Sequence, residues 1–83
     1  MAPRGDAKTF NQAFGRAVRE RRERLGMSQE DLGFEADLDR TYVSGIERGV
    51  RNPTLRIIKK VADALDTKAS RLLARAEGAG EDP

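Results

Sequence analysis

The chain has 83 residues, of which 37% are apolar and 36% are charged, with a formal net charge of +2 and no cysteine or histidine. Without cysteine there is no disulfide framework and no zinc–thiolate site, and without histidine the commonest general base and metal ligand are missing. We therefore expect one small domain that has no catalytic residue, binds no metal and needs no cofactor.

Targeting and membrane segments are also missing from the sequence. No apolar run reaches the length of a signal peptide, and none approaches the ~20 residues that span a bilayer. We expect a cytoplasmic protein with no membrane partner. Residues 1–8 and 77–83 lack apolar periodicity and carry Gly and Pro, so we expect two disordered tails around a domain at residues 9–76.

The first predicted helix runs from Thr9, its N-cap, to Leu25, because apolar residues recur at three- and four-residue spacing and Gly26 follows as a stop. A short second helix follows over residues 29–36. Its predicted N-cap is Ser28, with Asp31 three residues later in the capping-box position.

Three more helices follow the tight turn at residues 37–39. Asp39 caps a predicted helix over residues 40–48, which Gly49 ends. Two further helices are predicted over residues 55–65, with Thr54 as the N-cap, and over residues 67–76. No segment alternates with a period of two, so the expected fold class is an all-α, compact five-helix bundle.

The second and third helices are short and joined tightly, which is the pattern of a helix-turn-helix DNA-binding unit. A helical projection of residues 40–48 separates two faces. The expected core face holds Val43, Ile46 and Glu47. The opposite face is polar and small, and it holds Thr41, Ser44, Gly45 and Arg48.

Three stretches carry a more specific resemblance: Gly-Met-Ser-Gln-Glu-Asp-Leu at 26–32, Val-Ser-Gly-Ile-Glu-Arg-Gly at 43–49 and Asn-Pro-Thr-Leu at 52–55. In this spacing they resemble the phage Cro/repressor (XRE) family of helix-turn-helix regulators, over roughly Phe14 to Leu73. Residues 39–49 are similar to the controller proteins of restriction–modification systems. The resemblance implies a homodimeric transcription regulator on pseudo-palindromic operators, with half-sites ~34 Å apart.

Arg40 stands at the helix end that enters the major groove in such regulators, where its guanidinium can donate two hydrogen bonds to a guanine. The residues expected to contact bases are Arg40, Thr41 and Ser44. Those expected to contact the DNA backbone are Ser28, Gln29, Tyr42, Arg48, Arg51 and Asn52. Relatives also imply a structural ion pair between Arg22 and Glu47. Gly45 fits either a close approach to DNA or a relaxed surface position.

Two positions depart from the family pattern. Gly33 replaces the usual alanine, which we expect to weaken the second helix by about 0.5–1 kcal/mol. Asp37 replaces the usual glycine in the turn, where a left-handed backbone would place it under some strain.

The helix at 55–65 carries two apolar stripes, more than a small monomer needs. We therefore expect a two-fold dimer through this helix and the next, although one broad stripe buried in a monomer is the alternative. The predicted dimer residues are Ile57, Val61, Ala64, Leu72 and Leu73.

Other functions remain as alternatives. The chain could be the antitoxin of a toxin–antitoxin pair, or an interaction module that bridges a transcription factor to polymerase without binding DNA. RNA polymerase is a further candidate partner for a regulator, and the basic residues Arg4 and Lys8 could form an arm that touches the DNA backbone.

Overall fold

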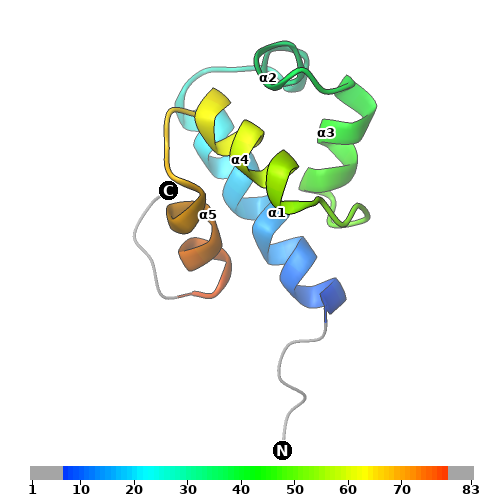
Figure 1. Cartoon of the computed structure of the whole chain (residues 1–83), viewed down its shortest axis with the longest axis vertical. Coiled ribbons are helices and arrows are strands. Elements are labelled where there is room, and N and C mark those ends of the chain that lie inside the picture. Colours follow the sequence, from blue (N-terminus) through cyan, green and yellow to red (C-terminus); the bar gives the residue numbers. More distant parts are fainter. Residues whose placement is uncertain (1–6, 79–83) are drawn as a thin grey trace, which may run out of the picture.

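The computed structural model describes residues 7–78 and contains five α-helices and no strand in that range. The helices are α1 (Ala7–Arg24), α2 (Gln29–Ala36), α3 (Arg40–Glu47), α4 (Leu55–Ala64) and α5 (Ala69–Ala76). Figure 1 shows α1 running through the middle of the bundle, with α3 and α5 on its two sides. The predicted all-α, five-helix fold is confirmed. Of the two predicted tails, residues 1–6 and 79–83 lie outside the described residues.

Local capping signals account for the starts of three helices. The Ser28 hydroxyl accepts from the Asp31 N–H and the Asp31 carboxylate from the Ser28 N–H, both at 2.9 Å, which completes the predicted capping box. Asp39 and Thr54 cap α3 and α4 by accepting from the backbone N–H groups of Thr41 and Ile57, without the reciprocal bond of a capping box. Gly26 follows α1 with a φ of 73°, a left-handed conformation that suits glycine.

Two helices begin at residues other than those predicted. α1 begins at Ala7, so Thr9 lies within the helix and is not its N-cap. α5 begins at Ala69 and has Lys68 at its N-cap, with no side-chain cap bond, so Thr67 lies outside it. Helix ends are weakly determined where no capping side chain marks them.

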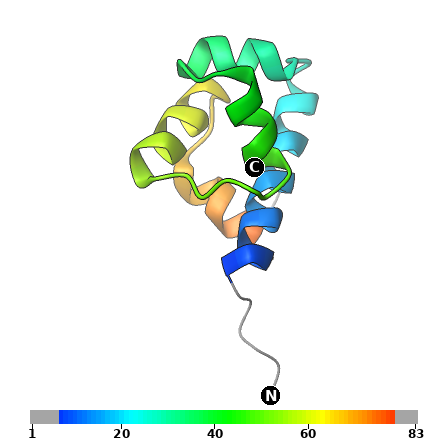
Figure 2. The ribbon, with the colours of Figure 1, turned by 90° about the vertical axis from the view of Figure 1, so that its right-hand side faces the viewer.

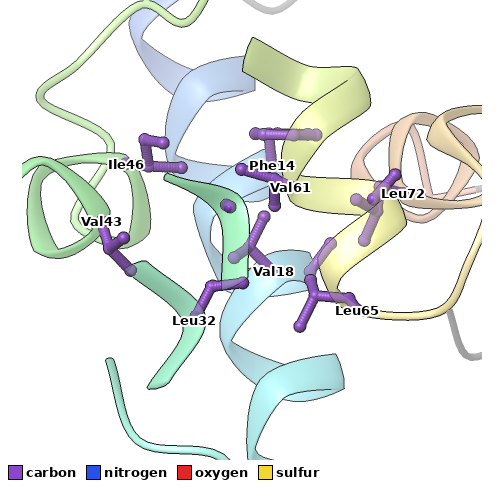
Figure 3. Close-up of a cluster of buried hydrophobic side chains, with 11 residues drawn as sticks. Phe14, Val18, Leu32, Val43, Ile46, Val61, Leu65 and Leu72 are labelled. Atoms are coloured by element: carbon purple, nitrogen blue, oxygen red, sulfur yellow. The ribbon is translucent and has the colours of Figure 1, made fainter. Parts of the chain in front are cut away.

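One hydrophobic core joins all five helices, and Figure 3 shows its larger side chains converging between them. The core residues are Phe14, Ala17, Val18, Leu32, Ala36, Val43, Ile46, Val61, Ala62, Leu65 and Leu72. Val61 and Leu72 are at most 1% exposed, so the prediction that they lie on a dimer surface is wrong. A small bundle needed both side chains to fill its own interior, which periodicity alone could not reveal.

Polar contacts also connect α1 to the end of α4 and to α5. The Arg21 guanidinium donates to the carbonyl oxygens of Leu65 and Asp66, at 2.9 and 3.0 Å, where α4 ends. Arg75 of α5 pairs with Glu20 at 3.1 Å. The bonds from Arg21 satisfy carbonyl groups that the end of α4 leaves without intrahelical partners.

The turn between α2 and α3 fixes the geometry of the helix-turn-helix. Asp37 has φ 57° and ψ 49°, so its backbone is left-handed, the case in which some strain was expected. The expectation for Gly33 is wrong, because a Cβ there would lie 2.6 Å from the carbonyl oxygen of Leu38. Alanine would force the turn apart, so glycine is the residue that this tight backbone accommodates.

Candidate nucleic-acid interface

One side of α3 packs on the core and the other faces solvent. Val43, Ile46 and Glu47 are buried, as the helical projection predicted, whereas Arg40, Thr41 and Arg48 are exposed. Ser44 is half-buried. The exposed side carries hydroxyl and guanidinium groups and no carboxylate of α3, a composition that suits the edges of base pairs and phosphate groups.

Gly45 is buried, so the expectation of a relaxed surface position is wrong. A Cβ at this position would lie 2.5 Å from Cγ of Arg51, because the Arg51 side chain crosses the helix there. The Arg51 guanidinium carbon lies 5.4 Å from the centre of the Tyr42 ring, within cation–π distance. Glycine therefore makes room for Arg51 to lie flat on α3 beside Tyr42.

The two arginines of the exposed face each contact a neutral partner. Nη1 of Arg40 donates to Oε1 of Gln29 at 3.3 Å, joining the first residue of α3 to the first residue of α2. Nε of Arg48 donates to the Ser44 hydroxyl oxygen at 3.2 Å, one turn earlier on the same helix. Neutral partners order a guanidinium without cancelling its charge, so both groups remain cationic toward an anionic ligand.

Thr41 is tied to the N-cap of its own helix. Its hydroxyl donates to Oδ1 of Asp39 at 2.6 Å, and its N–H donates to the same oxygen at 2.9 Å. These two bonds lower the pKa of Asp39 below its ordinary value of 3.8, and the bond from the Thr41 hydroxyl has the larger effect. Because the hydroxyl proton is engaged, Thr41 presents oxygen lone pairs and a methyl group to a ligand.

The predicted ion pair beneath α3 is present. Nε and Nη2 of Arg22 donate to the two carboxylate oxygens of Glu47 at 2.6 and 3.0 Å, and both side chains are almost fully buried. Nη1 of Arg22 also donates to the carbonyl oxygen of Met27 at 2.8 Å. The bond to Glu47 raises the pKa of Arg22 above its ordinary value. The pair fixes the end of α3 against α1 and the α1–α2 loop.

The other predicted backbone contacts lie at two places beside α3. Ser28 is exposed next to Gln29 at the start of α2. Asn52 is exposed in the loop over residues 48–54 from α3 to α4, which crosses the near face of the molecule in Figure 2. The structure thus brings the predicted residues to α3, the start of α2 and this loop, while the predicted dimer residues lie on α4 and α5.

Sequence reasoning missed one relationship in this region. The covering of Gly45 by Arg51 depends on a contact between segments that no spacing rule describes. Within residues 7–78, no group of three or more His, Cys, Asp or Glu side chains is placed to hold a metal ion. No helix in that range is long and apolar enough to cross a membrane.

The family model described as "Helix-turn-helix" matches residues 18–72, most of the folded part of the chain. The chain belongs to the helix-turn-helix family. The resemblance carried by residues 26–55 is thereby confirmed. Among the relatives of this helix-turn-helix protein, Control protein C.BamHI from Bacillus amyloliquefaciens is 51% identical over 61 residues, which cover 72% of this chain and 75% of the relative.

Solved structures agree with the assignment to the helix-turn-helix family. The restriction–modification controller protein C.AhdI from Aeromonas hydrophila is 48% identical, with a TM-score of 0.74, over 75% of this chain and 94% of that one. The controller protein C.Esp1396I, solved as a tetramer in complex with its natural 35 base-pair operator, is 30% identical, with a TM-score of 0.75, over 84% of this chain and 92% of that one. The helix-turn-helix protein therefore shares both sequence and fold with controller proteins.

Proposed function

We propose that this protein is a sequence-specific transcription regulator that binds pseudo-palindromic operators in double-stranded DNA as a homodimer, and that it controls restriction–modification genes. The observation that carries the proposal is the arrangement of α3. Its polar face is exposed, whereas its opposite face is fixed to α1 by the buried pair of Arg22 and Glu47. A rigid, partly cationic helix face without a carboxylate matches the major groove of DNA.

The face divides into residues that read bases and residues that set position. Arg40 is at the N-terminus of α3, the end that enters the groove in this docking geometry. The residues assigned to bases are Arg40, Thr41 and Ser44. Those assigned to the backbone are Ser28, Gln29, Tyr42, Arg48, Arg51 and Asn52. Contacts of the second kind orient the protein and carry little sequence information.

The relatives support the finer assignment to restriction–modification control. A controller protein shares about half of the matched residues with this chain, and another has been solved on its operator. The role needs neither a catalytic residue nor a cofactor, and we place it in the cytoplasm, where the DNA is. The protein would act through occupancy of its operator alone.

The dimer surface must use side chains that the monomer leaves accessible. Leu55 at the start of α4 is 80% exposed, and Ile57, Ala64 and Leu73 are half-buried. We assign the interface to these residues of α4 and α5. A two-fold axis there would set two copies of α3 on one side of the duplex, ~34 Å apart.

The test starts from a library of random duplexes, because such a selection works without a known operator sequence. The full chain should enrich a palindromic site, and its binding constant for that site should fall with salt at a log–log slope of about −0.9 for each phosphate contacted. Enrichment of no common site, together with an affinity that does not change with salt, would overturn the proposal.

A further inference from the structure

We infer that Gly45 is a positioning residue for DNA binding: because it has no side chain, Arg51 can lie across α3, the proposed recognition helix, and is held there before DNA arrives. The inference rests on the proposed function, in which Arg51 contacts the DNA backbone. Its observation is the space above Gly45. A Cβ added to Gly45 would lie 2.5, 3.2 and 3.4 Å from Cγ, Nε and Cδ of Arg51, so its three nearest atoms all belong to that side chain.

Arg51 lies on the side of α3 that is proposed to meet DNA. Gly45 follows Thr41 by four residues, so the two positions share one face of the helix, and Thr41 is exposed. Gly45 is buried although it is on that face, because Arg51 covers it. The proposed DNA-binding face therefore includes a cationic side chain that belongs to the following loop and not to α3.

The backbone of the loop is bound to the same glycine. The N–H groups of Val50 and Arg51 donate to the carbonyl oxygen of Gly45 at 2.9 and 3.2 Å. These bonds fix the point at which the Arg51 side chain leaves the loop, and the space above Gly45 fixes the direction that it takes. A larger residue at position 45 would keep both backbone bonds and block only the path of the side chain.

Tyr42 holds the far end of Arg51 without using its hydrogen-bond donors. The guanidinium carbon lies 5.4 Å from the centre of the Tyr42 ring, and contact with a ring face leaves the N–H groups available. A guanidinium group with available donors binds two oxygens of a phosphate. An arginine side chain loses much of its rotamer freedom when it is fixed, so holding it in the free protein strengthens the later contact.

The arrangement can be tested in the free protein by NMR. Tyr42 is the only tyrosine of the chain, so its ring protons are readily identified. NOE cross-peaks between these protons and the Arg51 side chain should be present in the wild type and lost in Gly45→Ala. Cross-peaks between Arg48 and Ser44 are the control and should persist. Arg51 cross-peaks that are absent from the wild type, or retained in the variant, would overturn the inference whether or not the protein binds DNA.

Gly45→Ala should remain folded, because the atoms that it displaces belong to an exposed and flexible side chain. Alanine also favours a helix more than glycine does, so the variant should melt at or above the wild-type temperature. Weaker binding by a protein at least as stable as the wild type separates a positioning role from a merely structural one. A large drop in melting temperature would mean that the methyl group disturbs α3 itself, and would overturn the inference.

The consequence for binding is tested on the duplex that the wild-type protein selects and on a scrambled duplex. Gly45→Ala should weaken binding to both by about fivefold, because the Arg51 contact loses its preformed geometry. In an Arg51→Ala background the same substitution should have no effect, since no arginine is left to displace. That double variant is the matched control, because it carries the same methyl group on the same helix.

Equal weakening by Gly45→Ala with and without Arg51 would mean that the methyl group obstructs the DNA itself, and would overturn the inference. Weakening confined to the selected duplex would make Gly45 part of base reading and would overturn it as well. If the wild-type protein selects no duplex, the proposed function fails and the role in binding fails with it, while the NOE cross-peaks still decide whether Gly45 places Arg51 against Tyr42.

Discussion

The backbone of Gly15 lies against the carbonyl oxygen of Ile46, so closely that a Cβ atom added to Gly15 would be 2.3 Å from that oxygen. The contact brings the middle of α1 against the C-terminal end of α3. Glycine at this position lets α3 approach α1 closely enough for Arg22 and Glu47 to pair. A close approach of two backbones is one of the few reasons for a glycine inside a helix.

Gly15→Ala should therefore destabilise the protein by about 1–3 kcal/mol, because the backbone of α3 must move to admit the methyl group. Alanine would otherwise stabilise an exposed helix by up to about 1 kcal/mol relative to glycine. Urea unfolding followed by circular dichroism measures the difference. A variant as stable as the wild type would show that α1 and α3 are less tightly packed than the distance from Gly15 to Ile46 indicates.

Arg22→Ala should cost about 3–5 kcal/mol, because it leaves the Glu47 carboxylate buried without its cation. Arg19→Ala is the matched control: Arg19 pairs with Glu23 on the surface of the same helix, and its loss should cost less than about 1 kcal/mol. Unfolding in urea would measure both free energies. Similar losses for the two variants would contradict a structural role for the buried pair.

Arg40→Ala should weaken binding to the selected duplex by about 1–3 kcal/mol and affect a scrambled duplex much less, if Arg40 contacts a guanine. Arg51→Ala should weaken both about equally and make the salt dependence shallower. Titration of both variants at two salt concentrations separates the roles. If Arg40→Ala weakened binding to the selected and scrambled duplexes equally, sequence reading would have to come from Thr41, Ser44 or DNA shape.

Leu55→Glu should give a folded monomer that binds the operator weakly, because Leu55 is exposed and a charge would oppose its burial between two copies. Val61→Asp should instead unfold the chain, since Val61 lies in the monomer core. Sedimentation and circular dichroism distinguish the outcomes. A Leu55→Glu variant that remains dimeric would place the interface elsewhere.

Acid should destabilise the protein through two helix caps. Bonds from Ser28 and Thr41 lower the pKa of Asp31 and Asp39 below 3.8, so the stability they contribute is present above that pH and is lost as the pH falls through the lowered values. Asparagine keeps an acceptor oxygen and does not titrate. The double variant Asp31→Asn, Asp39→Asn should therefore show a smaller drop in melting temperature from about pH 5 to pH 2.5 than the wild type. Equal drops in melting temperature for the variant and the wild type over this pH range would contradict this source of acid sensitivity.

Local signals were sufficient for much of the fold. Ser28, Asp39 and Thr54 accept hydrogen bonds from backbone N–H groups two or three residues away, so short stretches of sequence identify these helix starts. Family spacing identified the pairing of Arg22 with Glu47, although the two residues are 25 positions apart. Residue type and family spacing also selected the residues predicted to contact DNA, which lie on α3, at the start of α2 and in the loop after α3.

Most of the incorrect predictions about side chains concern which other part of the molecule packs against a residue. Val61 was assigned to a dimer, and a relaxed surface position was one of two expectations for Gly45, yet Val61 lies in the core and Arg51 covers Gly45. Periodicity gives the direction of a side chain relative to its own helix, but the partner that covers it depends on how distant segments pack.

The bonds from Arg21 to Leu65 and Asp66, with the pair of Glu20 and Arg75, also bear on how the chain matures during synthesis. α1 leaves the ribosome first, but its acceptors at the end of α4 are 44 and 45 residues further along, and its partner on α5 is 55 residues away. A nascent chain that stops before α4 ends lacks all of them. The recognition helix, which packs on α1, therefore gains its full support only after α5 has been synthesised.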